Sequence, residues 1–360
     1  MIIEKISLKG FRNYLNSEFI FQEGINFITG KNGIGKTNIV EAISVISSIK
    51  SFKNAKDEVI TKRDSDYYYC SADLKEQNFQ MNVEAGYDKN NSKKKIKVNG
   101  KEICNFSDFY GKVITVFFTP DDVYILTESP DKRRKYFDSV ISKYDNYYLR
   151  NILEYKKIIK TRNLILKEIR EKNRKRSDLD IWNRMFSEKT EKIVNKRIQF
   201  SEIFNNIFSA EYKKISEYDA VPVFSYKSDF KNFNENDIYN FLGKNIESEI
   251  YAGFSKFGPH KDDYLFQING GEKFIDYASQ GQKRTAALAI KNTEKDIVEK
   301  EKCDLAIIIV DDCFADLDMV RRHNLIKALS EKNQLIVTTV SLELMEDVFK
   351  SNSHVINLGE

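Results

Sequence analysis

The sequence predicts an α/β protein: a phosphate-binding nucleotide domain into which a helical block is inserted. The segment from Gly30 to Thr37 fits the phosphate-loop pattern G-x-x-x-x-G-K-[ST]. The region from about 281 to 358 alternates helix-like and strand-like segments, which is typical of a parallel sheet. Between these two parts, from about 121 to 215, glycine is absent and helix-forming residues dominate.

Composition restricts the class of protein. The chain has 360 residues, 41% of them hydrophobic, and a net charge of +4 that says little about nucleic acid by itself. No two of its four cysteines have C-x-x-C spacing and it has three histidines, so a zinc site is not expected. Scattered cysteines and a charged, strand-like N-terminus without a signal peptide predict reduced thiols in the cytoplasm. The sequence contains no run of about 18 apolar residues, so a membrane-spanning helix is not expected.

Strand patterns surround the phosphate loop in the first 120 residues. The strand before the loop is 25–29, and 38–49 is apolar at helical spacing, so the loop lies between a strand and a helix as the motif requires. Asn99-Gly100 is the strongest short hairpin signal in the chain. The other expected strands are 3–8, 19–21, 67–72, 80–85, 95–98, 101–103 and 113–118.

The helical block begins near 121. Pro130 followed by Asp131 predicts a helix start. Apolar residues at spacings of three and four predict two long antiparallel helices, from 147 to 172 and from after 178 to about 204, too short for an extended coiled-coil arm. A polar stretch at 231–247 closes the block. The sequence therefore predicts a helical insert at 121–247 and a discontinuous nucleotide domain made of 1–120 and 248–360.

The C-terminal part is expected to complete the sheet. A hairpin is predicted at 263–268 and 274–275, around the turn Asn269-Gly270-Gly271. The elements after it are a helix at 281–300, a strand at 305–310, a helix at 318–330, a strand at 335–339, a helix at 341–350 and a strand at 355–358.

The phosphate loop predicts binding of ATP with Mg²⁺. Its glycines let several backbone N–H groups point at one anion, and the following helix adds the positive end of its dipole. Lys36 can reach the outer phosphates and act in catalysis, and the Thr37 hydroxyl can ligate the metal. The candidate nucleotide-binding residues here are Gly30, Asn32, Gly33, Gly35, Lys36, Thr37 and Asn38.

Two further motifs point to the same chemistry. The strand that ends in Asp311-Asp312 would place Asp311 to hold Mg²⁺ and Asp312 to polarise the attacking water, although many strands end in two acids without such a role. Ser279, Gly281 and Gln282 open a helix and form either an ordinary N-cap or a second anion site. A second phosphate cradle is best explained if it binds the nucleotide held by another copy of the chain.

Positive charge is concentrated between Arg150 and Arg176, a segment that contains eleven basic residues and only three acids. Such a stripe is typical of a surface that binds a phosphate backbone, and no base-reading module accompanies it. DNA binding through it would be sequence-independent and salt-sensitive. A solvated basic helix is the alternative.

Together these motifs resemble those of the ABC-type ATPases, with Ser279–Gln282 as the signature, Asp311-Asp312 as the Walker B acids and Ala315–Asp318 as the D-loop. More narrowly, the chain resembles the RecF family of bacterial recombination mediators, which have an SMC-like ATPase head. The matching stretches run in the family's order: 10–14, 30–37, 118–122, 129–138, 258–263, 279–287 and 311–322.

The resemblance implies an ATP-dependent homodimer that binds double-stranded DNA near single-strand gaps and junctions. It implies recombinase loading together with RecO and RecR in recombinational repair, the SOS response and replication restart, and slow DNA-dependent ATP hydrolysis. It also puts Arg12 in a turn that folds over the nucleotide, with a surface arginine as the alternative. His260 is either functional or structural, and Arg133-Arg134 contact DNA or the head or form a solvated helix face.

The chain departs from these families in three places. Asp316 stands where RecF proteins usually have Glu, Thr338 or Thr339 replaces the switch histidine of ABC proteins, and Thr119-Pro120-Asp121 occupies the Q-loop region. Two other functions stay open: another SMC-like DNA-repair head, and a non-catalytic DNA-binding scaffold with a vestigial site. The short insert speaks against the first, and the intact Lys36, Thr37, Asp311 and Asp312 speak against the second.

Overall fold

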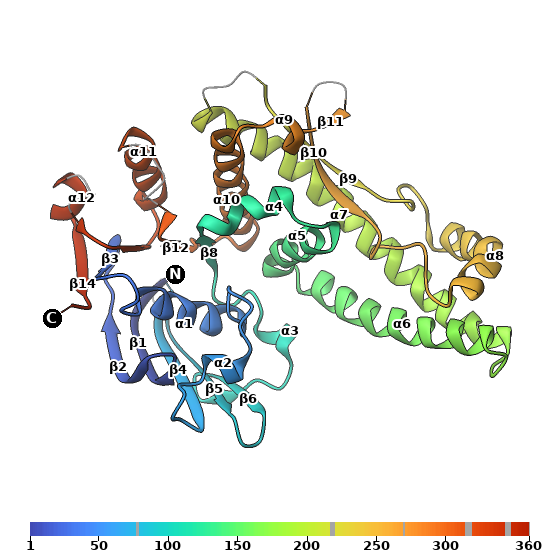
Figure 1. Cartoon of the computed structure of the whole chain (residues 1–360), viewed down its shortest axis with the longest axis horizontal. Helices are drawn as coiled ribbons and strands as arrows, with labels where there is room; N and C mark the ends of the chain where they lie inside the picture. Colours follow the sequence, from blue (N-terminus) through green and yellow to red (C-terminus); the bar gives the residue numbers. More distant parts are fainter. Residues whose placement is uncertain (77–78, 217–219, 269–270, 314–318, 343–346, 360) are drawn as a thin grey trace. The chain divides into compact units, whose positions relative to one another are not determined.

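The computed structural model describes residues 1–76, 79–216, 220–268, 271–313, 319–342 and 347–359 (Figure 1). It divides into two compact units. The first unit consists of Met1–Asp122 together with Glu294–Glu360, and the second is Val123–Thr293. The nucleotide domain is thus discontinuous in sequence, and each unit is described by itself below.

A five-stranded parallel sheet carries the phosphate loop in the first unit. Its order is β14-β3-β13-β12-β8, and the strands β3, β12 and β13 are buried at every residue, as in parallel sheets covered on both faces. Because the strands are parallel, their carboxyl ends meet at one edge, where open α/β folds bind ligands. The strands are β3 (Ile25–Thr29), β8 (Thr115–Phe118), β12 (Ile307–Asp311), β13 (Leu335–Thr339) and β14 (Ser353–Asn357).

A six-stranded antiparallel sheet makes up the rest of the first unit's β structure. Its order is β2-β1-β4-β5-β6-β7, with the strands β1 (Ile2–Phe11), β2 (Tyr14–Ile20), β4 (Tyr67–Glu76), β5 (Phe79–Asp88), β6 (Lys93–Val98) and β7 (Lys101–Glu102). Asn99 and Gly100, with φ of 48° and 76°, form the tight turn between β6 and β7 that the sequence predicts.

Helix α1 (Lys36–Ser48) follows the phosphate loop and packs against strands of both sheets. Its apolar residues lie on all sides of the helix, as is typical of a helix that is buried all round. Ile39, Val40, Ala42 and Ile43 are indeed fully buried. The other helices of this unit are α2 (Asp57–Ile60), α3 (Phe106–Phe109), α11 (Met319–Ser330) and α12 (Asp347–Ser351), with a 3₁₀ turn at Pro120–Val123.

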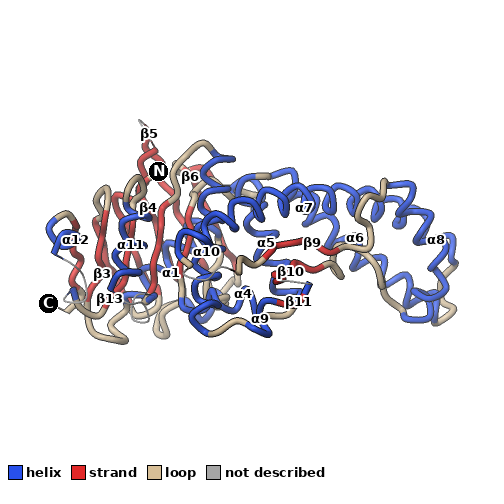
Figure 2. The backbone as a smooth tube through the Cα atoms, turned by 90° about the horizontal axis from the view of Figure 1, so that it is seen from above, coloured by secondary structure: helices blue, strands red, loops and turns tan. Residues whose placement is uncertain are grey.

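The second unit is built on a helical hairpin. Helices α6 (Asn146–Arg170) and α7 (Asp180–Ile215) run side by side, as the sequence predicts (Figures 1 and 2). Pro130 occupies the first turn of α5 (Pro130–Tyr144), where its missing N–H costs nothing. The remaining elements are α4 (Tyr124–Thr127), a 3₁₀ turn (Arg176–Leu179), β9 (Val223–Lys227), α8 (Glu235–Ala252), β10 (Asp263–Ile268), β11 (Glu272–Lys273), α9 (Phe274–Tyr277) and α10 (Gln280–Lys302), whose residues from Glu294 on belong to the first unit.

Three expectations differ from the structure in this unit. The polar stretch 231–247 is not the end of a domain, because it contains most of α8, which starts with a capping box between Asn234 and Asp237. Residues 274–275 belong to the short helix α9, and the strand beside β10 is β11 instead. The boundary expected after 247 therefore lies after Thr293, because α8 and the β11-β10-β9 sheet pack on α5, α6 and α7.

Candidate nucleotide-binding site

The candidate site lies at the carboxyl ends of three neighbouring parallel strands. The phosphate loop follows β3, Thr338 is the residue before the last of β13, and Asp311 ends β12. The Thr37 hydroxyl donates a hydrogen bond of 3.1 Å to the Asp311 carboxylate, although 274 positions separate the two residues. The structure thus brings together the two residues that the sequence assigns to Mg²⁺.

Backbone conformation explains the glycines of the phosphate loop. Gly30, Gly33 and Gly35 have φ of 148°, 82° and 125°, which side-chain-bearing residues rarely adopt. The Lys36 ammonium donates to the carbonyls of Gly30 and Lys31 over 2.7 Å and 3.2 Å, so it lies folded across the loop. Since α1 begins at Lys36, the positive end of its dipole adjoins the loop, as an anion site requires.

A turn between β1 and β2 holds the phosphate loop from outside. The Asn13 side-chain amide donates to the Ile34 carbonyl over 2.7 Å and accepts from the Asn38 amide over 2.9 Å. The Tyr14 hydroxyl donates to the Gly35 carbonyl over 3.2 Å. Asn13 and Tyr14 therefore set the position of the loop. Asn38 makes this contact too, while Asn32 is an exposed position of the loop.

Arg12, the turn residue expected to meet the nucleotide, is held by an ion pair. Its guanidinium contacts the Glu41 carboxylate at 2.6 Å and 2.7 Å and donates to the Val59 carbonyl over 3.1 Å. Glu41 is fully buried on α1 and also accepts from the Ser51 hydroxyl over 2.5 Å. Glu41 is not among the residues predicted from the sequence, although a single acid between Val40 and Ala42 on an apolar helix is a usable signal. A nucleotide contact by Arg12 stays a prediction.

Asp311 is a buried carboxylate with two hydroxyl donors. Its Oδ1 accepts from Thr37 and, over 2.8 Å, from Thr338. Burial raises the pKa of Asp311 and the neighbouring charge of Asp312 adds to this, whereas the hydrogen bond from Thr338 lowers the pKa. The carboxylate is costly to ionise without a cation, so the site favours binding of one.

Asp312 points differently from Asp311, as the sequence predicts. It is exposed, its φ is 51°, and its backbone N–H donates to the Thr338 hydroxyl over 3.0 Å. Thr339, by contrast, donates to the Ser341 carbonyl. Of the two threonines considered in place of the switch histidine, Thr338 is therefore the one that contacts both acids.

The oxygens of Thr37 and Asp311 fit Mg²⁺. This ion takes oxygen ligands and is commonly held by one or two protein groups together with water and substrate phosphates. A hydroxyl and a carboxylate 3.1 Å apart beside a phosphate loop provide such a pair.

Ser279 and Gln282 cap the start of α10 reciprocally. The Gln282 N–H donates to the Ser279 hydroxyl over 3.2 Å, and the Ser279 N–H donates to the Gln282 side chain over 2.7 Å. The N-cap alternative thus describes their geometry in a single copy of the chain. These residues and Gly281 belong to the second unit. The D-loop Ala315–Asp318 and the side chain of Arg321 lie outside the described residues.

The motif around His260 braces the second unit internally. Arg133 contacts both oxygens of Asp263, and Arg134 donates to the Asp262 carbonyl. The His260 ring bonds to the Tyr155 hydroxyl over 2.7 Å and to the Ser255 carbonyl over 3.0 Å, and burial lowers the pKa of His260 to about 4. These contacts match the structural alternative for His260, and they tie the arginine pair to β10.

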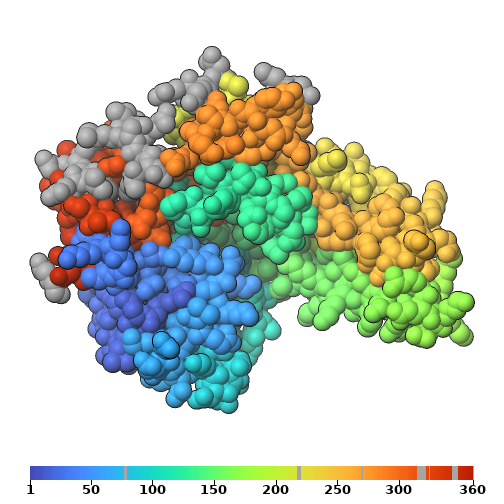
Figure 3. Space-filling view, viewed as in Figure 1, coloured from blue at the N-terminus to red at the C-terminus, as the bar shows by residue number. Residues whose placement is uncertain are grey.

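Several basic residues of the segment 150–176 are buried or paired with acids, so fewer of them are free on the surface than the sequence suggests. Arg162 is fully buried and paired with Glu249. Arg174 contacts Glu168 and Asp178, and Arg176 contacts Glu247. Four exposed cations remain on one stripe of α6 at helical spacing: Lys156, Lys160, Lys167 and Arg170. We call these four the α6 stripe; the green α6 segment lies at the surface seen in Figure 3.

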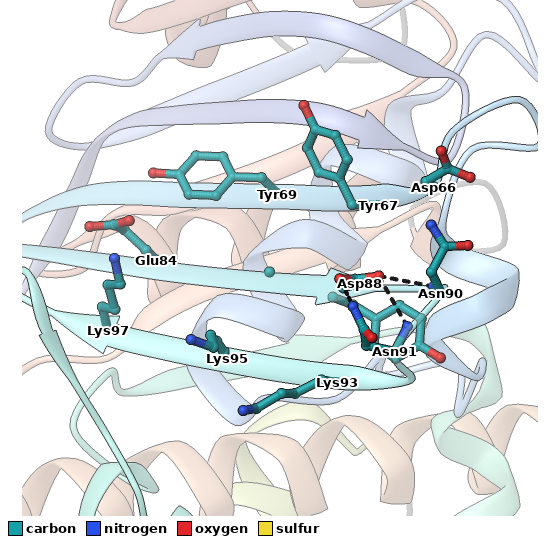
Figure 4. Close-up of a pocket in the computed structure, with 12 residues that line it drawn as sticks. Asp66, Tyr67, Tyr69, Glu84, Asp88, Asn90, Asn91, Lys93, Lys95 and Lys97 are labelled. Atoms are coloured by element: carbon teal, nitrogen blue, oxygen red, sulfur yellow. Dashed lines mark hydrogen bonds between the residues drawn. The ribbon is translucent and has the colours of Figure 1, made fainter.

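A groove on the outer face of the antiparallel sheet is a separate feature. It has a volume of about 790 Å³, and Tyr67, Tyr69 and Gly86 form part of its lining (Figure 4). Its three lysines are balanced by three acids, among them Asp88, which accepts from the Asn91 amide. The groove therefore has no preference for an anion, and it contains none of the motif residues. Within the described ranges, no helix has the length and apolar character needed to cross a membrane.

Comparisons with known proteins agree with this geometry. The model of the RecF/RecN/SMC N-terminal domain matches residues 2–358. The chain is 33% identical over 365 residues to "DNA replication and repair protein RecF" of Thermoanaerobacter sp. (strain X514), covering 100% of both chains. It is 33% identical over 353 residues to the protein of that name from Bacillus velezensis, covering 95% of this chain and 94% of that one.

Solved structures lead to the same family. A structure described as the recombination mediator protein RecF-ATP in the RecFOR pathway has a TM-score of 0.89 and 32% identity, covering 94% of this chain and 92% of that one. The Smc head domain from Pyrococcus furiosus, at 19% identity and a TM-score of 0.52 with 97% of this chain and 91% of that one covered, shares the fold. The ABC-type, SMC-like head fold expected from the motifs is thus confirmed, and the chain belongs to the RecF family within the RecF/RecN/SMC N-terminal domain proteins.

Proposed function

We propose that this chain is an ATP-dependent DNA-binding recombination mediator. ATP and Mg²⁺ bring two copies together around double-stranded DNA at single-strand gaps, and the dimer promotes recombinase loading in the cytoplasm together with RecO and RecR. The observation that carries the proposal is the contact of 3.1 Å between Thr37 and Asp311, which joins phosphate loop and acid strand into one site. Family membership supports the wider role, since a similar protein of known structure is described as a recombination mediator with ATP.

Each residue of the site has a chemical role in this proposal. The phosphate loop binds the nucleotide through its backbone N–H groups, and Lys36 moves from the carbonyls of Gly30 and Lys31 to the outer phosphates. Thr37 and Asp311 hold Mg²⁺, which would neutralise charge on the phosphates when bound. Asn13 and Tyr14 keep the loop in place from outside.

Hydrolysis is proposed to be slow and to act as a release step. Asp312 polarises the attacking water, for which its exposed position is suitable. Thr338 replaces a histidine here and cannot carry a proton in the same way, which agrees with weak, DNA-dependent turnover.

The dimer is proposed to complete the site. The N–H groups at the start of α10, with Ser279, Gly281 and Gln282, would contact the nucleotide bound by the other copy. The cap between Ser279 and Gln282 orders this helix end before the second copy arrives.

DNA is proposed to bind along the α6 stripe. Its cations lie at intervals of four, seven and three residues on one exposed helix face, and no base-reading element accompanies them. Binding would therefore be sequence-independent, on duplexes and on single-strand/double-strand junctions alike.

Size-exclusion chromatography of the purified chain tests the nucleotide switch. With ATP and Mg²⁺ the chain should elute as a dimer, and Lys36→Met should stay monomeric under the same conditions. Asp312→Asn should bind ATP and stay dimeric because hydrolysis is stalled. A Lys36→Met variant that dimerises normally with ATP would contradict the shared site, and undiminished turnover in Asp312→Asn would assign the water to another residue.

A further inference from the structure

Two aromatic side chains are exposed beside the α6 stripe. Tyr251, in the last turn of α8, is 85% exposed, and Phe254, just after the helix, is 46% exposed. Single exposed rings are common on protein surfaces, but these two lie three residues apart beside a row of exposed cations. Their neighbours indicate what they bind.

The segment that carries both rings is fixed against α6. The Arg170 guanidinium donates to the Ala252 carbonyl over 3.2 Å, and the Asn163 side chain accepts from the Ser255 N–H over 2.8 Å. Asn163 lies on the same face of α6 as Lys160, Lys167 and Arg170. Gly253 ends α8 with φ of 76°, a conformation that favours glycine, and a Cβ there would lie 2.8 Å from the Arg170 guanidinium. The backbone that carries both rings is therefore fixed by hydrogen bonds next to the α6 stripe.

The charge around the two rings is positive. The Lys261 ammonium lies 5.5 Å from the centre of the Phe254 ring, and Lys256 is exposed two residues further along. Two of the acids nearby are paired with other cations, since Glu249 is buried against Arg162 and Glu247 contacts Arg176. The contact of 3.9 Å between Glu171 and Lys167 is exposed to solvent and therefore weak. An anionic ligand with flat rings matches this surface.

We propose that Tyr251 and Phe254 form a stacking platform for the unpaired bases of a single nucleic-acid strand. Arg170, Lys167 and Lys261 hold the phosphates of that strand. Proteins bind single strands by combining a basic track with aromatic faces, and the stacking tolerates any base because every base has a π-face. The inference rests on the proposed DNA-binding function and adds to it a source of preference for single-stranded segments.

The platform would distinguish single strands from duplexes, because only in a single strand can the rings reach the faces of the bases. In a continuous duplex the faces of the bases are covered by their neighbours in the stack, so a duplex can use the α6 stripe but not the rings. A strand next to a gap offers open bases and phosphates together. Loss of the rings should therefore weaken binding of single strands while leaving that of blunt duplex unchanged.

Fluorescence anisotropy with the full chain tests this, using a labelled oligothymidine and a blunt duplex of the same length. Tyr251→Ala and Phe254→Ala should each weaken oligothymidine binding roughly 5- to 150-fold, the size of one lost base stack, with duplex binding unchanged. Tyr251→Phe should bind like the wild type because it keeps the ring. Tyr277→Ala is the matched control, since Tyr277 is 63% exposed in the same unit but its hydroxyl donates to Glu272.

Crosslinking locates the contact. Iodouracil placed in the oligonucleotide should crosslink to Tyr251 or Phe254, and crosslinks confined to the first unit would overturn the platform. Equal losses for single strand and duplex, or no loss in Tyr251→Ala, would also overturn it while leaving the DNA-binding function intact. A wild-type chain that binds neither nucleic acid overturns both proposals. If the same variants lose binding only to phosphatidylserine vesicles, the surface is a lipid site and the platform is wrong.

Discussion

The Arg12 guanidinium and the Glu41 carboxylate meet through two contacts, of 2.6 Å and 2.7 Å, inside the first unit. The pair fixes the turn that also carries Asn13 and Tyr14, both of which contact the phosphate loop. We therefore expect nucleotide binding to depend on the Glu41 carboxylate even if Glu41 does not touch the nucleotide. The bidentate geometry suits Arg and not Lys at position 12.

Glu41→Gln should destabilise the chain and weaken ATP binding together. The substitution leaves Arg12 without its counter-charge, and breaking a buried pair in this way costs about 3–5 kcal/mol. Because the Arg12 side chain keeps 21% exposure, we expect about 2–3 kcal/mol in urea denaturation. Glu18→Gln is the control, since Glu18 pairs with Lys5 on the surface and should leave stability and ATP affinity unchanged. Full ATP affinity in Glu41→Gln would contradict a positioning role.

Gly35→Ala should abolish nucleotide binding, whereas Gly33→Ala should weaken it much less. A Cβ at Gly35 would lie 2.6 Å from the Asn13 side-chain nitrogen and 2.7 Å from the Tyr14 hydroxyl, but a Cβ at Gly33 meets nothing within 4 Å. Both positions have positive φ, so both variants strain the backbone, but only Gly35→Ala also adds a clash. Titration with a fluorescent ATP analogue measures the difference. Equal losses in the two variants would show that strain alone decides.

Thr338→Val should make magnesium binding more sensitive to acid. Thr338 donates to Asp311 and so lowers its pKa, which burial raises; without the hydroxyl, the pKa of Asp311 should rise further. Magnesium needs the ionised carboxylate, so binding is lost as the pH falls through this pKa, and a higher pKa moves the loss to higher pH. Magnesium titrations of ATP-induced dimerisation, repeated at successively lower pH, should show a growing difference between Thr338→Val and the wild type.

Thr339→Val is the matched control for this prediction. The Thr339 hydroxyl donates to Ser341 and not to an acid of the site. It should therefore behave like the wild type at every pH. A parallel shift in both variants would indicate a general change at the end of β13.

Replacing two lysines of the α6 stripe should lower the salt dependence of duplex binding. Each phosphate contact contributes about 0.9 to the slope of log K against log salt, so Lys160→Gln with Lys167→Gln should reduce that slope by roughly 2. The effect should be the same for every duplex sequence. Lys273→Gln, an exposed lysine on β11, should leave the slope unchanged. A slope that does not move in the stripe variant would place the duplex elsewhere.

Local patterns were sufficient to predict the phosphate loop, the acid strand and the helical hairpin. Each is defined by residues close in sequence: glycines with positive φ, a fully apolar strand, and apolar spacing of three and four. The strand order β14-β3-β13-β12-β8 could not be derived in this way, because neighbours such as β3 and β13 lie far apart in the chain. The sequence also could not decide whether Thr338 or Thr339 contacts the acids, because this depends on the register in which β12 pairs with β13.

Charge counting overstated the basic surface for a physical reason. Arg162 falls on the buried face of α6 with Ile158 and Ile165, so its charge is neutralised by Glu249 from another helix. The helical spacing of those isoleucines indicates this burial in the sequence. Its partner could not be inferred, since 87 positions separate Arg162 from Glu249.

The strand order has a consequence for how the chain folds during synthesis. Strands β3 and β8 emerge early, but two places in the sheet lie between them, and these are filled by β13 and β12 from the last part of the chain. The ribosome must therefore deliver the whole second unit while the first remains half-built, with apolar strand edges waiting for partners. Asp311, which is proposed to hold Mg²⁺, is also made only after the second unit. Chaperone demand should consequently peak late in translation, and chains truncated before β12 should aggregate even when their helical unit has folded.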